Sequence, residues 1–271
     1  VRLIHNLSLL RQGLIEGTYR HGSYTRFGLS DPKPRLIHKA SVRDRVVHHL
    51  LYRMLYGYFD ARFAYDSYSC RVDKGTHKAL ERFKSFSRAV SQNYTSTLWV
   101  LKCDIRKFFA NIDHTVLREI LCASIDSPET LWLLENVVNS FSTEGKPGVG
   151  LPLGNLTSQL LVNVYMNDFD QFVKHGLKVR HYIRYADDFV FLSRDRDYLE
   201  SLLPQVEIFL KERLHLELHP DKVSIVTFAS GIDFLGWVHF PRHRVLRTVA
   251  KRRMFRALRE DPKEARVLSY L

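Results

Sequence analysis

Two adjacent aspartates, Asp187 and Asp188, interrupt an otherwise apolar stretch of the chain. Residues 181–186 before them and 189–193 after them are rich in β-branched and aromatic side chains, a pattern that predicts two short strands joined by a tight turn. Like charges at one turn repel each other unless a cation lies between them, and carboxylate oxygens suit a hard divalent ion such as Mg²⁺. A solvated turn is the simpler interpretation of an Asp-Asp pair, but the apolar segments on both sides favour a metal-binding site.

A third acid, Asp104, follows a second apolar segment, residues 97–103, which we expect to form a buried strand. An Asp at such a place is often only a helix cap. Here Phe108 and Phe109 come soon after the acid, which predicts a pocket with aromatic walls beside the carboxylate. Asp104 is therefore the candidate third carboxylate of the site.

The segments that must position these acids carry clear helix and turn signals. Ser41 is a candidate N-cap for a helix whose apolar residues recur at helical spacing. Residues 65–75 predict a polar loop before a helix that begins near Thr76. Residues 144–155 form a Gly/Pro-rich loop before a long helix. This loop is either a flexible connection or a place where a nucleotide lies against bare backbone near a helix N-terminus, which favours anions.

Basic side chains gather in three segments, each of which is either a solvated face or a contact for phosphates, which Arg binds with a rigid two-pronged fork. The first segment, residues 33–45, has five Lys and Arg opposed only by Asp44, and the third, residues 241–259, has eight and no acid. A basic helix there could follow a phosphate backbone. The candidate phosphate-binding residues in the three segments are Lys33 and Arg35, then Arg71 and Lys74, and finally Lys251, Arg252 and Arg253.

The composition supports a folded protein with a polyanionic partner. The chain has 271 residues, 45% hydrophobic content, a formal charge of +12 and a pI near 9.7. Its three cysteines form no C-x-x-C pair, so neither a zinc site nor a disulfide framework is indicated. With no signal peptide and no apolar run long enough for a membrane span, we expect a cytoplasmic protein. Because it begins with Val1 and stops after a basic segment, we expect a fragment.

In this order, the motifs from about residue 33 to residue 237 resemble the palm and fingers of a reverse transcriptase. Tyr185-Ala186-Asp187-Asp188 is similar to the catalytic hairpin of that family, and residues 102–109 are similar to the segment with the first palm acid. The resemblance implies an α+β fold shaped as a polymerase right hand. Its expected parts are fingers at residues 1–96, a palm at 97–240 with a helical segment at 115–150 that borders the fingers, and the start of a thumb at 241–271.

The resemblance also implies metal and substrate roles for single residues. Asp104 and Asp187 would hold two Mg²⁺ ions, for which Mn²⁺ could substitute, with Asp188 beside them and the carbonyl oxygen of Ile105 as a further ligand. Phe109 would select deoxynucleotides by excluding a 2′-hydroxyl. The other implied roles are triphosphate binding for Arg35 with Lys33, proton donation to pyrophosphate for Lys222, and a primer grip for Phe234, Leu235, Gly236 and Trp237.

The segment 151–159 distinguishes branches of the family. Most reverse transcriptases, including those of group II introns, have Gln at the place of Leu153 and Pro at the place of Gln159. The combination of Leu153, Gly154 and Gln159 is similar to the enzymes of diversity-generating retroelements, which copy a template RNA with frequent errors opposite adenine and work with a small basic accessory protein.

These features imply an RNA-directed DNA polymerase that binds an RNA template, a DNA or RNA primer, and dNTPs. The alternatives are another bacterial reverse transcriptase, intron-derived or active in phage defence, and a non-catalytic nucleic-acid-binding module on the same fold.

Overall fold

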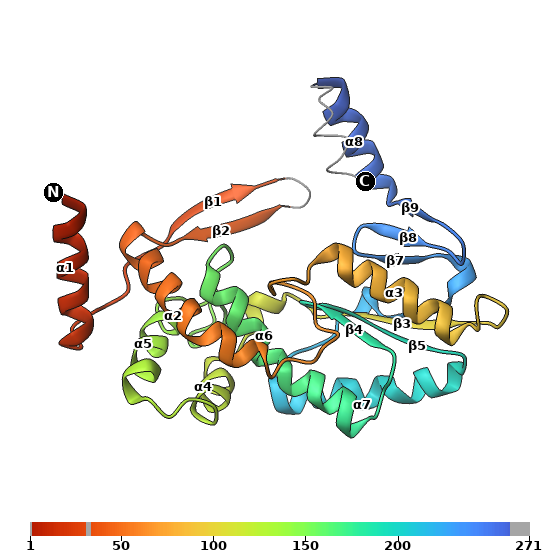
Figure 1. Cartoon of the computed structure of the whole chain (residues 1–271), viewed down its shortest axis with the longest axis horizontal. Coiled ribbons are helices and arrows are strands. Elements are labelled where there is room, and N and C mark those ends of the chain that lie inside the picture. The colour runs from red at the N-terminus through yellow and green to blue at the C-terminus, as the bar shows by residue number, and fades with distance from the viewer. Residues whose placement is uncertain (1, 31–33, 261–271) are drawn as a thin grey trace.

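A computed structural model describes residues 2–30 and 34–260 of the chain (Figure 1). Its central sheet has four antiparallel strands in the order β4-β5-β3-β6. These strands are β3 (Trp99–Asp104), β4 (Tyr182–Tyr185), β5 (Asp188–Ser193) and β6 (Ser224–Thr227). The predicted strand before Asp104 and the predicted strands around the Asp-Asp pair are both present.

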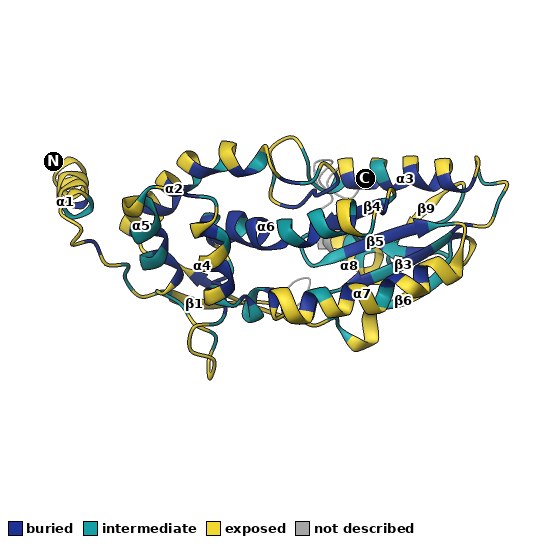
Figure 2. Ribbon diagram, turned by 90° about the horizontal axis from the view of Figure 1, so that it is seen from below, coloured by how far each residue is buried: buried dark blue, intermediate teal, exposed yellow. Residues whose placement is uncertain are grey.

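The central sheet is covered by helices on both faces. On one face, Val190 and Leu192 of β5 pack with Phe83 of α3 (Thr76–Val90). On the other face, Phe189 and Phe191 pack with α6 (Leu156–Gln171) and α7 (Arg196–Leu214). Figure 2 shows β3 and β5 between α3 and α7, with the buried residues of both helices turned toward the strands. Burial of both faces explains why β5 is a continuous apolar run rather than an alternating one.

The N-terminal half forms a second lobe beside the sheet. A two-stranded antiparallel hairpin stands above α2 and α6 in Figure 1. The Ser41 side chain accepts a hydrogen bond from the backbone N–H of Asp44, so the predicted N-cap is confirmed. Apart from α3 and β3, which belong to the central sheet and its cover, the elements of this half are α1 (Arg2–Ile15), β1 (Thr25–Leu29), β2 (Arg35–Lys39), α2 (Val42–Asp60), α4 (His114–Cys122) and α5 (Pro128–Val138).

The last described segment forms a third small sheet and a helix. Strands β7 (Ile232–Phe234), β8 (Trp237–His239) and β9 (Arg244–Leu246) pair in that order. Helix α8 (Thr248–Glu260) then leads away from the body of the molecule (Figure 1). Mixed helices and antiparallel sheets confirm the predicted α+β class. None of the helices in the described residues has the length and apolar character that a membrane span requires.

Candidate active site

The turn between β4 and β5 brings the three predicted acids together. Tyr185 pairs with Asp188 across the hairpin, and Ala186 takes a left-handed φ of 56° that closes the tight turn. Asp104 at the end of β3 is the cross-strand partner of Asp188. The backbone N–H of Ile105 donates to the carbonyl oxygen of Asp187 at 3.0 Å. The turn is therefore fixed against the end of β3, and carboxylates from two segments lie together at one end of the inner strands β3 and β5.

Two lysines face these acids. Lys222, in a short 3₁₀ turn (Pro220–Lys222), places its Nζ 2.8 Å from Oδ1 of Asp104. That turn is held in place because the N–H of His219 donates to the carbonyl oxygen of Asp104 at 2.8 Å. Lys102 of β3 places its Nζ 3.5 Å from Oδ2 of Asp188. Lys222 was a sequence candidate, whereas Lys102 was not, although its place two residues before Asp104 puts both side chains on one face of the strand.

The acids carry more negative charge than the two lysines neutralise. Burial raises the pKa of Asp187, and repulsion from Asp104 raises it further, while Lys222 and Arg35 act in the opposite direction. Burial also raises the pKa of Asp188, to about 7, against the attraction of Lys102 and with added repulsion from Asp104 and Asp187. Oδ1 of Asp188 is buried without a hydrogen-bond partner. An excess of buried carboxylate charge is the condition that a divalent cation relieves.

The donor set fits Mg²⁺ only in part. In the described residues no group of three or more His, Cys, Asp or Glu side chains forms a ready-made metal cage. Mg²⁺ is commonly held by one or two carboxylates together with substrate phosphates and water rather than by an all-protein cage. Asp104 and Asp187 fit that incomplete kind of site.

The loop 151–155 is hydrogen-bonded to strand β2. The N–H of His38 donates to the carbonyl oxygen of Leu153 at 2.9 Å, and the Asn155 side chain donates to the carbonyl oxygen of His38 at 2.8 Å. Gly154 has a φ of +103°, and a Cβ there would lie 2.7 Å from Cγ2 of Ile37. The group that approaches Gly154 is thus the Ile37 side chain of β2, where the sequence interpretation had placed a nucleotide.

The substrate-facing candidates lie around this loop. Arg35 begins β2, and its charge lowers the pKa of Asp187. Phe109 is half-buried, and its carbonyl oxygen accepts from the N–H of Leu151 at 2.7 Å. Gln159 is half-buried in the first turn of α6. Arg35 is therefore near Asp187, and Phe109 is held beside Leu151 of the loop. Lys33 lies outside the described residues.

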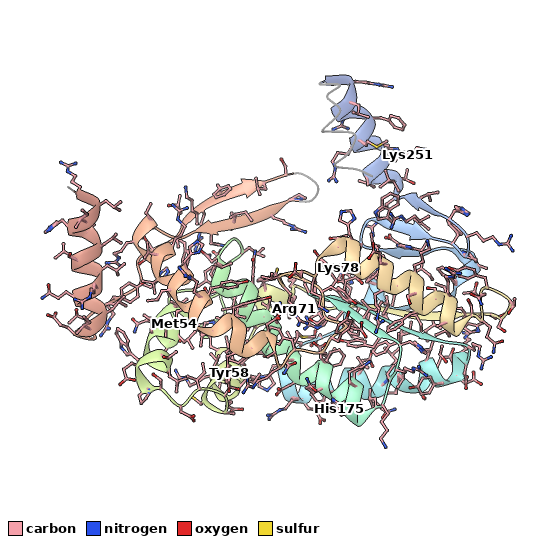
Figure 3. The ribbon with its side chains drawn as sticks, in the orientation of Figure 1. Met54, Tyr58, Arg71, Lys78, His175 and Lys251 are labelled. Atoms are coloured by element: carbon pink, nitrogen blue, oxygen red, sulfur yellow. The ribbon has the colours of Figure 1, made fainter. Side chains whose placement is uncertain are left out.

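Two of the residues predicted to contact nucleic acid, Arg71 and Lys74, donate hydrogen bonds to other groups of the protein. The side chain of Arg71 is 6% exposed and donates to Asp60 and to the carbonyl oxygens of Ala64 and Ser67. This arrangement argues against the predicted contact of Arg71 with nucleic acid, because its guanidinium holds the loop 60–71 together; Figure 3 shows it within the body of the molecule. Lys74 donates to the carbonyl oxygen of Tyr65 at 2.8 Å and lies over its ring.

The predicted primer-grip residues form the β7–β8 turn. Leu235 and Gly236 both have positive φ, and Trp237 lies under the Arg244 guanidinium at 4.4 Å. Phe234 is fully buried against Phe83, with ring centroids 5.4 Å apart, so it anchors the hairpin on α3 and is not available to a primer. On α8, Lys251 and Arg252 are exposed and Arg253 is half-buried; Figure 3 shows Lys251 on this outer helix.

Comparison with protein families and curated proteins gives consistent matches. Residues 30–239 match the family described as reverse transcriptase (RNA-dependent DNA polymerase). Protein YkfC of Escherichia coli (strain K12) is 24% identical over 301 residues, which cover 97% of this chain and 77% of that protein. The group II intron-encoded protein LtrA of Lactococcus lactis subsp. cremoris is 21% identical, and the match covers 83% of this chain and 48% of LtrA.

Solved structures share the fold. A C-terminally truncated apo telomerase from Candida tropicalis superposes with a TM-score of 0.59 at 12% identity, covering 90% of this chain and 60% of that one. Telomerase from Candida albicans, in complex with a fragment of telomeric RNA, gives a TM-score of 0.57 at 10% identity, covering 88% and 50%. This chain thus spans about half of LtrA and 60% or less of these telomerase chains.

Proposed function

Because this chain belongs to the reverse transcriptase (RNA-dependent DNA polymerase) family, we propose that it extends a DNA or RNA primer with deoxynucleotides on an RNA template. The observation that carries the proposal is the convergence of Asp104, Asp187 and Asp188 at one end of strands β3 and β5, with charge that the neighbouring lysines do not neutralise. A non-catalytic nucleic-acid-binding module has no need for such a repulsive cluster, which costs folding energy.

Asp104 and Asp187 would hold the metal ions, with the carbonyl oxygen of Ile105 as a further ligand. Two Mg²⁺ ions, for which Mn²⁺ can substitute, would supply charge for aligning the primer 3′-hydroxyl and for stabilising the leaving pyrophosphate. Phosphoryl transfer of this kind depends on positioning and charge neutralisation rather than on covalent catalysis. Lys222, which contacts Asp104, would donate a proton to the pyrophosphate.

The residues on the fingers side of the acids would bind the nucleotide. Arg35, whose charge reaches Asp187, would hold the triphosphate, with Lys33 as its helper. The Phe109 ring would close the space that a ribose 2′-hydroxyl needs. Leu153 and Gly154 would flank the sugar, and Gln159 would lie behind them on α6.

The template–primer duplex would cross the palm between the fingers and α8. We assign residues 1–96 to the fingers, 97–240 to the palm and 241–271 to the start of a thumb. The exposed Lys251 and Arg252, with Arg253, would contact phosphates, and Leu235, Gly236 and Trp237 would support the primer end. Phosphate contacts of this kind release counterions, so we expect binding to weaken steeply as salt is raised.

Primer extension on a primed RNA tests this function. We expect incorporation by the wild-type chain with Mg²⁺ and a loss of roughly 1,000-fold or more in Asp187→Ala, since removal of a metal-binding acid removes transition-state charge stabilisation. Asp126→Ala, which removes an exposed acid away from the turn, is the matched control and should retain full activity. If wild type incorporates no more nucleotide than Asp187→Ala, the chain is better described as a non-catalytic nucleic-acid-binding module.

Within the family, we assign the chain to the error-prone enzymes of diversity-generating retroelements, which would bring a small basic accessory protein as partner. Leu153 supports this assignment, because replacing a polar side chain beside the sugar removes a hydrogen bond that orients the correct nucleotide. The group II intron relative LtrA favours the intron-derived alternative. Leu153→Gln should reduce misincorporation opposite adenine in sequenced cDNA, and an unchanged error spectrum would remove the support that Leu153 gives.

A further inference from the structure

Lys102 connects the catalytic turn to a different part of the molecule. Its side chain is 17% exposed, and its Nζ lies 3.5 Å from Oδ2 of Asp188. The same ammonium donates to the backbone carbonyl oxygen of Asp233 in β7 at 2.5 Å. One largely buried cation therefore bridges the strand that follows the catalytic turn and the first strand of the β7–β9 sheet.

Asp233 contacts Lys102 through its backbone and Arg247 through its side chain. Its carboxylate accepts from the Arg247 guanidinium, whose Nε lies 3.0 Å away. The backbone N–H of Arg247 donates to the carbonyl oxygen of Gly236 in the β7–β8 turn at 3.1 Å. A continuous set of contacts thus runs from Asp188 through Lys102, Asp233 and Arg247 to the β7–β8 turn.

The two lysines of the site have separate partners. Lys222 reaches Asp104 from an exposed 3₁₀ turn, whereas Lys102 reaches Asp188 from inside the sheet. Within the part of the chain that the structure describes, Asp188 forms an ion pair with Lys102 through Oδ2, and its Oδ1 is buried without a hydrogen-bond partner. Asp188 is therefore placed to anchor Lys102.

We propose that Lys102 is a positioning residue that fixes the β7–β8 turn, and with it the primer end, relative to the catalytic acids, with Asp188 as its anchor. The inference rests on the proposed polymerase function. Lysine suits this role because its ammonium has three donors on a long stem and can serve an acidic and a carbonyl acceptor at once. Without it, the carbonyl oxygen of Asp233 and the carboxylate of Asp188 would both lose their partner.

Misplacement of the primer end should reduce the rate of the chemical step more than nucleotide binding. A shift of about 1 Å in a reacting group can cost roughly 100-fold in rate. For Lys102→Met we therefore expect kcat to fall by about 10- to 100-fold while KM for the dNTP changes by less than about 3-fold. Lys102→Arg, which keeps the charge and the donors, should recover part of kcat. Lys211→Met, an exposed lysine on α7, should match wild type.

A double mutant separates the proposed bridge from independent effects. If Asp188 acts on the primer end through Lys102, adding Lys102→Met to Asp188→Asn should reduce kcat by less than about 2-fold, since residues in one network are not additive. A double mutant with the full product of both losses overturns the proposal, as does a Lys102→Met variant with wild-type kcat.

Hydrogen exchange gives a readout that needs no catalysis. In Lys102→Met, amides of Ile232–His239 should exchange at least about 10-fold faster than in wild type, while those of β4 keep their protection. Unchanged exchange in β7 and β8 overturns the bridge even if the chain polymerises. Faster exchange in Lys102→Met, together with a wild-type chain that incorporates no nucleotide, would instead refute the polymerase function and keep the bridge.

Discussion

The Arg184 guanidinium and the Asp170 carboxylate form a fully buried ion pair, with Nη2 2.6 Å and Nε 2.8 Å from the two carboxylate oxygens. Arg184 lies three residues before Asp187, and its Nη1 donates to the carbonyl oxygen of Ala186 at 3.2 Å. Tyr182 also donates to Asp170, at 2.8 Å. The pair therefore holds the base of the β4–β5 turn against helix α6.

Removing the charge of Asp170 should destabilise the whole molecule. In Asp170→Asn the guanidinium of Arg184 stays buried without a counter-charge, which typically costs about 3–5 kcal/mol. Urea unfolding would measure this loss as a lower midpoint. The control is Glu200→Gln, which breaks an exposed i,i+4 pair with Arg196 and should change stability by about 0.5 kcal/mol or less. Equal midpoints for both variants would contradict the role of the buried pair.

Gly154 should resist any side chain, for two separable reasons. In Gly154→Ala the new Cβ would need a φ near +103° and would lie 2.7 Å from Cγ2 of Ile37; we expect a loss of about 1–3 kcal/mol. Thermal unfolding would measure the loss. Gly148→Ala also requires a positive φ, of +72°, but has no close neighbour, and Gly28→Ala has neither a positive φ nor a close neighbour.

The three alanine variants should therefore rank in one order. Gly28→Ala should be close to neutral, Gly148→Ala intermediate and Gly154→Ala the least stable. Adding Ile37→Ala to Gly154→Ala should remove the clash with Cγ2 of Ile37 but leave the backbone strain at position 154. If Gly148→Ala and Gly154→Ala lose the same stability, contact with Ile37 of β2 is not what requires glycine at position 154.

His48 gives the folded state a pH dependence. The Nδ1 of His21 lies 2.6 Å from the carbonyl oxygen of Gly22, which can only accept, so this nitrogen carries the proton and Nε2 of His21 accepts from His48 at 3.1 Å. The other nitrogen of His48 then accepts from the Thr157 hydroxyl at 2.6 Å. Burial lowers the pKa of His48 to about 4, helped by His21 and His49 and opposed by Asp44.

The folded protein should lose stability on acidification through this histidine. The unfolded chain takes up a proton near pH 6.5 that the folded state resists until about pH 4, so stability falls as the pH decreases through that window. The shift corresponds to roughly 3 kcal/mol. Urea unfolding from pH 7 to pH 4 should show a smaller decrease in His48→Gln than in wild type. Parallel curves for both proteins would contradict the assignment.

The sequence predicted the parts of the site that depend on local pattern. Continuous apolar runs predicted the strands that end at Asp104 and begin at Asp188, because a sheet covered on both faces requires them. Strand β9 was not predicted, since a strand of three residues is too short to show an alternating pattern. The burial of Arg71 and Phe234 also depends on distant partners, Asp60 and Phe83, whose proximity no local pattern reveals.

The role of Lys102 was missed for a related reason. The sequence places Lys102 on the same face of its strand as Asp104, but the acceptor of Lys102 in β7 lies 131 positions further along the chain. Helix α1 was not predicted either, and in the structure only Leu10 of this helix is buried. A helix with so little burial has a weak apolar face, and periodicity is the main signal for a helix in a sequence.

Phe109 should decide between deoxyribonucleotides and ribonucleotides in the proposed polymerase. Its ring lies against Phe108 in an edge-to-face arrangement, with centroids 5.6 Å apart, and its backbone is fixed by the N–H of Leu151. Phe109→Ala would open the space that the ring fills, so the ratio of kcat/KM for dNTP to that for NTP should fall by roughly 10- to 100-fold. Phe109→Tyr keeps the ring and should keep the discrimination. Single-nucleotide incorporation with each nucleotide measures both, and an unchanged ratio in Phe109→Ala would assign the selection of the sugar to another residue.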